Sequence, residues 1–305
     1  MVVTPSPSDV DESLLRRLLR RQAPHLGGLS LKHVAAGWDN HIWRVGDDLA
    51  VRLTRRAVAA DLHAHEQTWL PVIAGGLPLP VPIPLVIGRP SPDYPWPWSV
   101  VPWFDGDVAA MTPPAPGEAR TLGRFLAALH ESAPDEAPHN PDRGIPLALR
   151  RRAVWESNQH QWTAENFLLT AAASRVIDAG VAASPARDRV WLHGDLHPRN
   201  VLVNGGRLAA VLDWGDITAG DPATDLAVVW WLFELTSHNK FWTAYRPVSE
   251  ATWHRARAWA ALFGLSFLTF ALPDAHNTPD LQAHELARHL LRRVVAPQRP
   301  FGGTA

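Results

Sequence analysis

The spacing of apolar residues changes once along this chain, and that change constrains the fold more than any other feature. Over residues 29–34, 41–45 and 49–53 apolar and polar side chains alternate, which is typical of half-buried β-strands. Beyond Gly106 the spacing becomes helical, as in residues 118–132, where the apolar side chains fall on one face. The pattern predicts an antiparallel sheet first and mainly helices after it.

Further segments extend this prediction. A helix is expected over residues 58–70, ending at Pro71, and a short apolar strand over residues 98–104. A hairpin is expected where Asn204-Gly205-Gly206 separates residues 201–203 from 208–212. More helices are predicted over residues 225–235, 252–272 and 281–295. We therefore predict an α+β chain with two lobes, a sheet lobe over residues 1–104 and a helical lobe over residues 105–305.

Composition excludes several classes of protein. The chain has 305 residues, 46% of them hydrophobic, and no cysteine, so it can bury a core but cannot form disulfides or thiolate metal sites. A net charge of -1 gives no general attraction to nucleic acid or to an acidic membrane. The longest apolar run, residues 258–272, is shorter than the roughly 20 residues of a membrane span. With no export signal at the N-terminus, we expect a soluble, cytoplasmic protein that binds neither nucleic acid nor membranes.

Residues capable of chemistry are concentrated in one segment. His193, Asp195 and Asn200 lie together, and Asp213-Trp214-Gly215 follows after the predicted hairpin. In protein kinases the catalytic loop reads His-Arg-Asp, four residues and then Asn, and a later Asp-Phe-Gly supplies a second metal ligand. Asp195 and Asn200 are likewise separated by four residues. Two independent spacings thus favour a phosphoryl-transfer site.

The residue types fit the roles that such a site needs. Phosphoryl transfer to an alcohol requires a positioned hydroxyl and neutralised charge more than covalent catalysis. Asp195 is predicted to accept or orient the hydroxyl proton. The Asn200 carbonyl and the Asp213 carboxylate are predicted to coordinate Mg²⁺, a hard cation that prefers oxygen ligands. His193 is expected to hold the loop through hydrogen bonds.

These motifs resemble those of the aminoglycoside phosphotransferase family, which also includes macrolide, choline and homoserine kinases. The resemblance rests on residues 192–200, 212–216 and 220–226. The family usually has Gly where this chain has Arg199, which matters if the position needs a positive φ or if Arg199 adds a cation beside the phosphates. The resemblance implies a bilobal protein-kinase-like fold. It also implies an enzyme that uses Mg²⁺ and transfers phosphate from ATP or GTP to a small hydroxylated acceptor.

The resemblance extends, less specifically, into the first half of the chain. A kinase small lobe carries a lysine on its third strand that touches the phosphates and pairs with a glutamate on the next helix. This chain offers Arg52 and Glu66 instead, and a surface ion pair is the alternative interpretation. Gly37 is the implied phosphate-covering residue in the loop before the second strand.

The remaining site residues follow from the same resemblance. Adenine is expected against the strand around residues 101–104, where Val101, Trp103 and Phe104 lie. His193, His197 and Asp225 are expected in supporting roles. Asp221 and Asp225 occupy turn and helix-start positions, where carboxylates cap backbone N–H groups.

Two other functions remain open at this point. His193, Asp195 and His197 alternate as ligands would in a metal-dependent hydrolase, although Asn200 and Asp213 would then have no role. The second alternative is a kinase-like protein that binds nucleotide without catalysis.

The acceptor is also open from the sequence. An aminoglycoside would favour an acidic cleft, to which Asp105, Asp107 and Glu234 could contribute, whereas Trp230 and Trp231 could line a pocket for a macrolide. Ordinary solvated surface and core packing explain the same residues.

Overall fold

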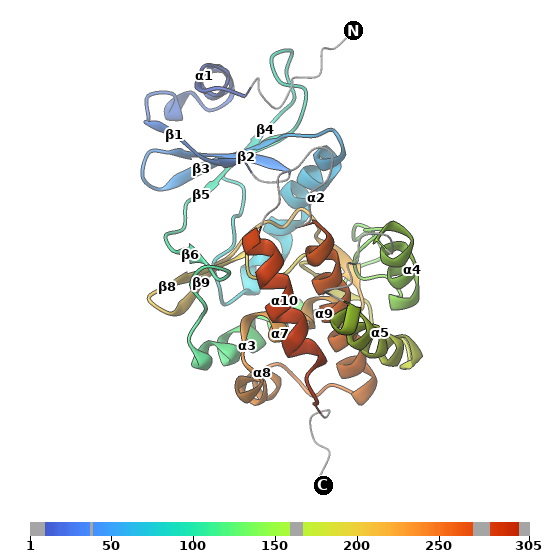
Figure 1. Cartoon of the computed structure of the whole chain (residues 1–305). Helices are drawn as coiled ribbons and strands as arrows, with labels where there is room; N and C mark the ends of the chain where they lie inside the picture. Colours follow the sequence, from blue (N-terminus) through green and yellow to red (C-terminus); the bar gives the residue numbers. More distant parts are fainter. Residues whose placement is uncertain (1–9, 37–38, 159–166, 271–280, 299–305) are drawn as a thin grey trace. The chain divides into compact units, whose positions relative to one another are not determined.

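The computed structural model describes residues 10–36, 39–158, 167–270 and 281–298. The chain divides into two compact units: Met1–Asp105 together with Ala210–Ile217, and Gly106–Ala209 together with Thr218–Ala305. The segment Ala210–Ile217 therefore groups with the first unit, although it lies within residues 105–305 of the predicted helical lobe. The α+β fold, with a sheet followed by mainly helices, is confirmed (Figure 1).

The first unit is built on a five-stranded antiparallel sheet of order β1-β2-β3-β5-β4. The predicted meander is confirmed, and the strands are β1 (Leu31–Ala36), β2 (Asn40–Val45), β3 (Leu49–Thr54), β4 (Val86–Gly88) and β5 (Trp98–Pro102). Strand β4 was not predicted, because it is three residues long and follows a proline-rich connection.

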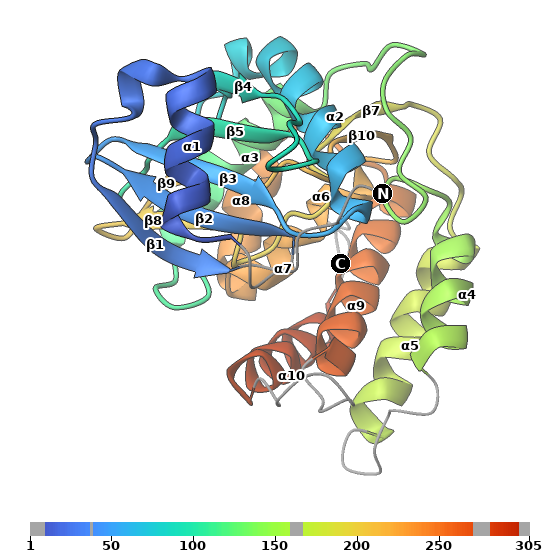
Figure 2. The same cartoon turned by 90° about the horizontal axis from the view of Figure 1, so that it is seen from above.

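Helix α1 (Glu12–Gln22) lies across this sheet, as Figures 1 and 2 both show. Asp11 begins the helix by accepting a hydrogen bond from the Leu14 N–H at 2.8 Å. The leucines of the helix then pack with Trp43, Val51 and Trp98 of the sheet in one buried cluster. The core of the first unit thus lies between α1 and the strands.

Helix α2 (Val58–Ile73) extends beyond its predicted end, and Pro71 lies inside it. The expectation that the helix ends at Pro71 was wrong. A proline in the last turn removes only the hydrogen bond that its own N–H would have made, and the N–H of Ala74 still reaches the Leu70 carbonyl. The buried face of α2 carries His63 and Glu66.

The second unit is mainly helical, with a long helix α9 (Glu250–Phe270) that contacts α4 (Leu147–Asn158), α5 (Phe167–Ala182) and α10 (Leu281–Val295) (Figure 2). The amphipathic helix predicted over residues 118–132 is α3 (Ala119–Leu129), which packs against α8 (His238–Ala244). The single helix predicted over residues 225–235 was wrong. It is two short helices, α6 (Ala223–Leu226) and α7 (Val228–Leu232), and extended backbone at Phe233 ends the second one.

Short strands flank residues 193–200 in this part of the chain. Strand β7 (Val190–Leu192) pairs antiparallel with β10 (Thr218–Gly220), and β6 (Asp107–Val108) pairs with β8 (Val201–Asn204). The predicted hairpin is confirmed as β8 and β9 (Arg207–Val211), with Gly205 and Gly206 at φ 57° and 78° in its turn. Strands β6, β7 and β10 were not predicted, because two or three residues do not establish a period.

Of the helices that the structure describes, none has both the length and the apolar character needed to cross a membrane.

Two glycines hold β10 against the loop that precedes α4. Gly144 has φ +66°, and a Cβ on Gly220 would lie 2.2 Å from the Gly144 carbonyl oxygen. The contact is backbone against backbone, so neither side can move away by a change of rotamer.

Gly220→Ala should therefore lower the free energy of unfolding by about 1–3 kcal/mol. Gly117→Ala is the matched control in the same unit, because a Cβ at Gly117 meets nothing within 4 Å, and it should change stability by no more than about 0.5 kcal/mol. Urea unfolding followed by circular dichroism measures both. Equal stabilities of the two variants would contradict the packing assigned to Gly220.

Candidate active site

The segment from His193 to Asn200 follows β7 directly, and Asp225 holds its start. The Asp225 carboxylate accepts the backbone N–H of His193 at 2.7 Å and that of Gly194 at 2.9 Å. Asp225 is fully buried, and Gly194 has φ 86°, a conformation that favours glycine. The loop therefore leaves the strand with its first two amide groups fixed.

Asp225 binds a different partner from the one predicted. Asp221 caps its local backbone as expected, accepting the Ala223 N–H at 3.0 Å. The N–H groups bound by Asp225, by contrast, belong to residues about 30 positions earlier in the chain. His130 Nε2 lies 3.4 Å from the same carboxylate, and its Nδ1 lies 2.7 Å from the Tyr245 hydroxyl. Only folding could bring His130 and Tyr245 to this position.

Asp195 presents a charged and partly accessible carboxylate. Its side chain is 25% exposed, Oδ1 accepts a hydrogen bond from Arg143 at 2.8 Å, and Oδ2 lies 3.3 Å from His197 Nε2. Burial raises the pKa of Asp195, but Arg143 and His197 outweigh burial and hold it well below its usual range. His193 Nδ1 accepts the Asp195 N–H at 3.2 Å, as expected for a residue that holds the loop. Asp195 is therefore ionised throughout the physiological range.

Asn200 closes the loop on itself. Its side-chain nitrogen donates to the Asp195 carbonyl at 2.9 Å, and its own N–H donates to the His197 carbonyl at 2.9 Å. Because the amide nitrogen is engaged, the amide oxygen is the atom that can bind a metal.

Arg199 does not need the flexibility of glycine. Among the non-glycine residues that the structure describes, only Asp213 has a positive φ. The left-handed conformation considered for Arg199 is therefore absent from the structure, and substitution by arginine causes no backbone strain there.

The first unit contains a network of three charges, two of them buried. Arg52 forms an ion pair with Glu66 through one terminal nitrogen and donates to Asp213 Oδ1 at 2.7 Å through the other. Glu66 is fully buried and the Arg52 side chain is 8% exposed, so the alternative of a surface pair was wrong. Burial lowers the pKa of Arg52, but Glu66 and Asp213 outweigh it and raise the pKa above its ordinary value.

Glu66 also connects helix α2 to the Asp213-Trp214-Gly215 motif. Burial raises the pKa of Glu66, whereas Arg52 and the backbone N–H of Trp214 lower it. The Trp214 ring is fully buried and donates to the Val211 carbonyl at 3.0 Å. These contacts, with φ 59° at Asp213, fix the backbone of the motif while the Asp213 side chain stays half exposed.

The other residues expected at the nucleotide lie in or beside β5. Val101 is buried in the strand, and the Trp103 N–H donates to the Asp48 carbonyl at 2.7 Å. Phe104 is partly buried, and Gly37 lies outside the described residues. The adenine position therefore remains a prediction.

The donors available to a metal are hard oxygens. The half-exposed Asp213 carboxylate and the Asn200 amide oxygen are of the type that Mg²⁺ prefers. No group of three or more His, Cys, Asp or Glu suited to a metal occurs among the described residues, so the hydrolase alternative gains no ligand set there. The residues fit Mg²⁺ better than zinc.

Comparison with known families agrees with this geometry. Residues 30–262 match the model of the phosphotransferase enzyme family, APH. The chain belongs to this family, and it is a small-molecule kinase. No curated protein matches the sequence.

Three solved structures illustrate the shared fold. The GDP and kanamycin complex of APH(2")-IIIa has a TM-score of 0.70 at 18% identity, covering 92% of this chain and 98% of that one. Spectinomycin phosphotransferase APH(9)-Ia with ADP and spectinomycin has a TM-score of 0.70 at 14% identity, covering 94% and 98%. Macrolide 2'-phosphotransferase MphH from Brachybacterium faecium has a TM-score of 0.60 at 22% identity, covering 94% and 99%. These likenesses confirm the kinase-like fold.

Sequence reasoning missed Arg143, His130 and Tyr245. Arg143 contacts Asp195, while His130 and Tyr245 extend the network around Asp225. None of the three lies in a motif, and each is 20 or more residues along the chain from the carboxylate whose surroundings it helps to form. No local signal in the sequence could have identified them.

The buried Arg52–Glu66 pair yields a stability prediction. Arg52→Met leaves Glu66 buried without its partner, which should cost about 3–5 kcal/mol at pH 8. Burial raises the pKa of Glu66, so lowering the pH toward 5 should protonate it in the variant and recover part of the loss. Chemical denaturation at both pH values measures this.

Arg21→Met is the control, because Arg21 pairs with Asp93 while 59% exposed, and it should cost less than about 1 kcal/mol. A loss in Arg52→Met that does not change with pH would contradict the role given to Glu66.

Proposed function

We propose that this kinase transfers the γ-phosphoryl group of ATP or GTP to a hydroxyl of a small molecule, using Mg²⁺. The acceptor classes proposed are aminoglycoside antibiotics, macrolide antibiotics and related metabolites. Residues 1–104 would bind the nucleotide, and residues 105–305 would carry the catalytic loop and the acceptor site. The observation that carries the proposal is an ionised, partly exposed Asp195 on a loop whose backbone Asp225 holds.

The chemistry assigned to Asp195 follows from its charge. A carboxylate with a low pKa is a weak base, so it orients the acceptor hydroxyl first and receives the proton late. The acceptor oxygen forms a bond to the γ-phosphorus while the bond from that phosphorus to the β–γ bridging oxygen breaks. The hydroxyl proton passes to Asp195, and the nucleoside diphosphate leaves.

The other residues position charge. Asn200, through its amide oxygen, and Asp213, through its carboxylate, would hold Mg²⁺, which when bound neutralises charge on the nucleotide phosphates. Arg52 keeps a fixed positive charge, and the N–H groups that its guanidinium does not use in binding Glu66 and Asp213 would donate to phosphate oxygens. Val101, Trp103 and Phe104 are proposed to receive the adenine, and Gly37 to lie over the phosphates.

Asp195→Asn tests the catalytic assignment. The amide cannot accept the hydroxyl proton, so kcat for transfer should fall at least about 100-fold, while nucleotide affinity should change little. Phosphate transfer from labelled ATP and GTP to a panel of hydroxyl compounds measures turnover, and calorimetry measures nucleotide binding. Asp188→Asn, the same change at an exposed aspartate, is the control. Unchanged turnover in Asp195→Asn would exclude the role.

Asp213→Ala tests the metal assignment. Without this carboxylate, the increase in nucleotide affinity caused by Mg²⁺ should be lost, whereas affinity without metal should remain similar. Titration calorimetry with and without Mg²⁺ gives both values. Asp61→Ala is the control, because Asp61 is an exposed aspartate of α2. An undiminished effect of Mg²⁺ in Asp213→Ala would show that the ligand lies elsewhere.

A further inference from the structure

A positive side chain outside every motif contacts the catalytic carboxylate. The Arg143 guanidinium donates to Asp195 Oδ1 at 2.8 Å, and its central carbon lies 5.0 Å from the ring centre of Phe263 in α9. The Arg143 side chain is 15% exposed. The cation is thus held between a carboxylate and an aromatic face, a geometry that stabilises arginine.

The backbone around Arg143 is tied to the strands that position the catalytic loop. Thr218 of β10 accepts the Asn140 N–H at 3.1 Å and donates to the Pro138 carbonyl at 2.8 Å. Next to Arg143, Gly144 packs against Gly220 at the other end of β10. Strand β10 pairs with β7, and β7 leads into His193. The same two strands therefore position the backbone of both Arg143 and Asp195, and the contact between the two side chains follows from the packing of the second unit.

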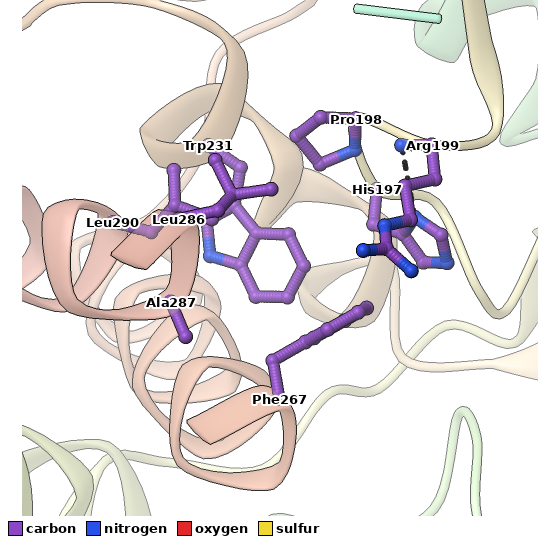
Figure 3. Close-up of a pocket in the computed structure, with 8 residues that line it drawn as sticks. All are labelled: His197, Pro198, Arg199, Trp231, Phe267, Leu286, Ala287 and Leu290. Carbon is purple, nitrogen blue, oxygen red and sulfur yellow. Dashed lines mark hydrogen bonds between the residues drawn. The ribbon is translucent and has the colours of Figure 1, made fainter. Parts of the chain in front are cut away.

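The part of the loop that follows Asp195 in the sequence lines an apolar hollow (Figure 3). Figure 3 shows the rings of Trp231 and Phe267 on one side and the His197–Arg199 stretch of the loop on another, with Leu286 and Leu290 of α10 nearby. His197 makes an edge-on contact with Phe267 at 5.1 Å between ring centres. The residues drawn include one positive side chain, Arg199, and no carboxylate. The lining of this hollow therefore offers no negative charge to a cationic group.

Three described carboxylates of the second unit are paired with arginines. Asp142 forms an ion pair with Arg150 of α4, and Asp221 with Arg255 of α9 at 2.6 Å. Glu234, considered for an acidic cleft, pairs with Arg293 of α10. A cationic acceptor would therefore meet arginines at each of these carboxylates, including Asp195.

We propose that Arg143 is a specificity-determining residue, and that the acceptor is a hydroxyl compound that carries no positive charge near the reacting hydroxyl. This inference rests on the proposed function. An ammonium group beside the hydroxyl at Asp195 would lie within a few ångströms of the Arg143 guanidinium and be repelled. An uncharged acceptor meets no such repulsion. Aminosugars with several free amines are disfavoured.

The experiment compares amine acceptors with their N-acetyl derivatives, in which an acetyl group replaces the positive charge. Kanamycin and phenyl 2-amino-2-deoxyglucoside are each assayed as the free amine and as the N-acetyl derivative, with phenyl glucoside as an uncharged probe. Turnover is measured with Mg²⁺ and ATP or GTP, and binding of each probe is measured by calorimetry. The wild-type enzyme should prefer the uncharged form of each pair at least tenfold, in kcat/KM or in affinity. Arg143→Glu should reverse that preference.

Two further variants keep the test decisive. Arg143→Gln removes the charge but keeps a donor, so it should abolish the preference without reversing it, even if Arg143→Glu folds poorly. Arg152→Glu makes the same charge change at a 78% exposed arginine of α4, and it should keep the wild-type preference.

Three outcomes would overturn the inference: equal or better use of the amines by the wild-type enzyme, no difference between Arg143→Gln and wild type, or no binding of any uncharged probe. Failure of the proposed function is a separate result, namely no binding of nucleotide in the presence of Mg²⁺ and no phosphate transfer to any compound.

Discussion

The two hydrogen bonds from the catalytic loop to Asp225 are the constraint on which the rest of the site depends. A fully buried carboxylate is stable only when its oxygens are hydrogen-bonded, and here the N–H groups of His193 and Gly194 satisfy them at 2.7 and 2.9 Å. The same bonds fix the point at which the loop leaves β7. The backbone placement of Asp195 and Asn200 follows from that point, because hydrogen bonds within the loop connect both residues to it.

Charge is handled differently in the two units. In the first unit, the buried Arg52 forms ion pairs with both Glu66 and Asp213. This one cation therefore connects helix α2 to the Asp213-Trp214-Gly215 segment. In the second, Arg143 keeps Asp195 ionised and leaves it a quarter exposed. The first arrangement mainly orders the backbone. Under the specificity that we propose, the second sets the electrostatic character of the surface that an acceptor would meet, so a residue outside the family motifs would influence selectivity.

Much of the fold follows from local patterns. The alternating segments before residue 54, the Gly205-Gly206 turn and the amphipathic face of α3 each reflect contacts close in sequence, and each was predicted. The failures have equally local causes. Strands of two or three residues show no period, Pro71 removed a single hydrogen bond without ending α2, and residues 225–235 hold two helices because the apolar run continues through their junction.

The sequence by itself determined the family and the order of the motifs, and it predicted the roles of Asp195, Asn200 and Asp213, because the family's catalytic motifs place these residue types at characteristic spacings. Tertiary structure alone decided which side chains surround them. Arg143 lies 52 residues before Asp195, and His130 lies 95 residues before Asp225. Contacts across such distances depend on how helices and strands pack, and no spacing along the chain encodes them. The charge environment of Asp195 is therefore a property of the fold.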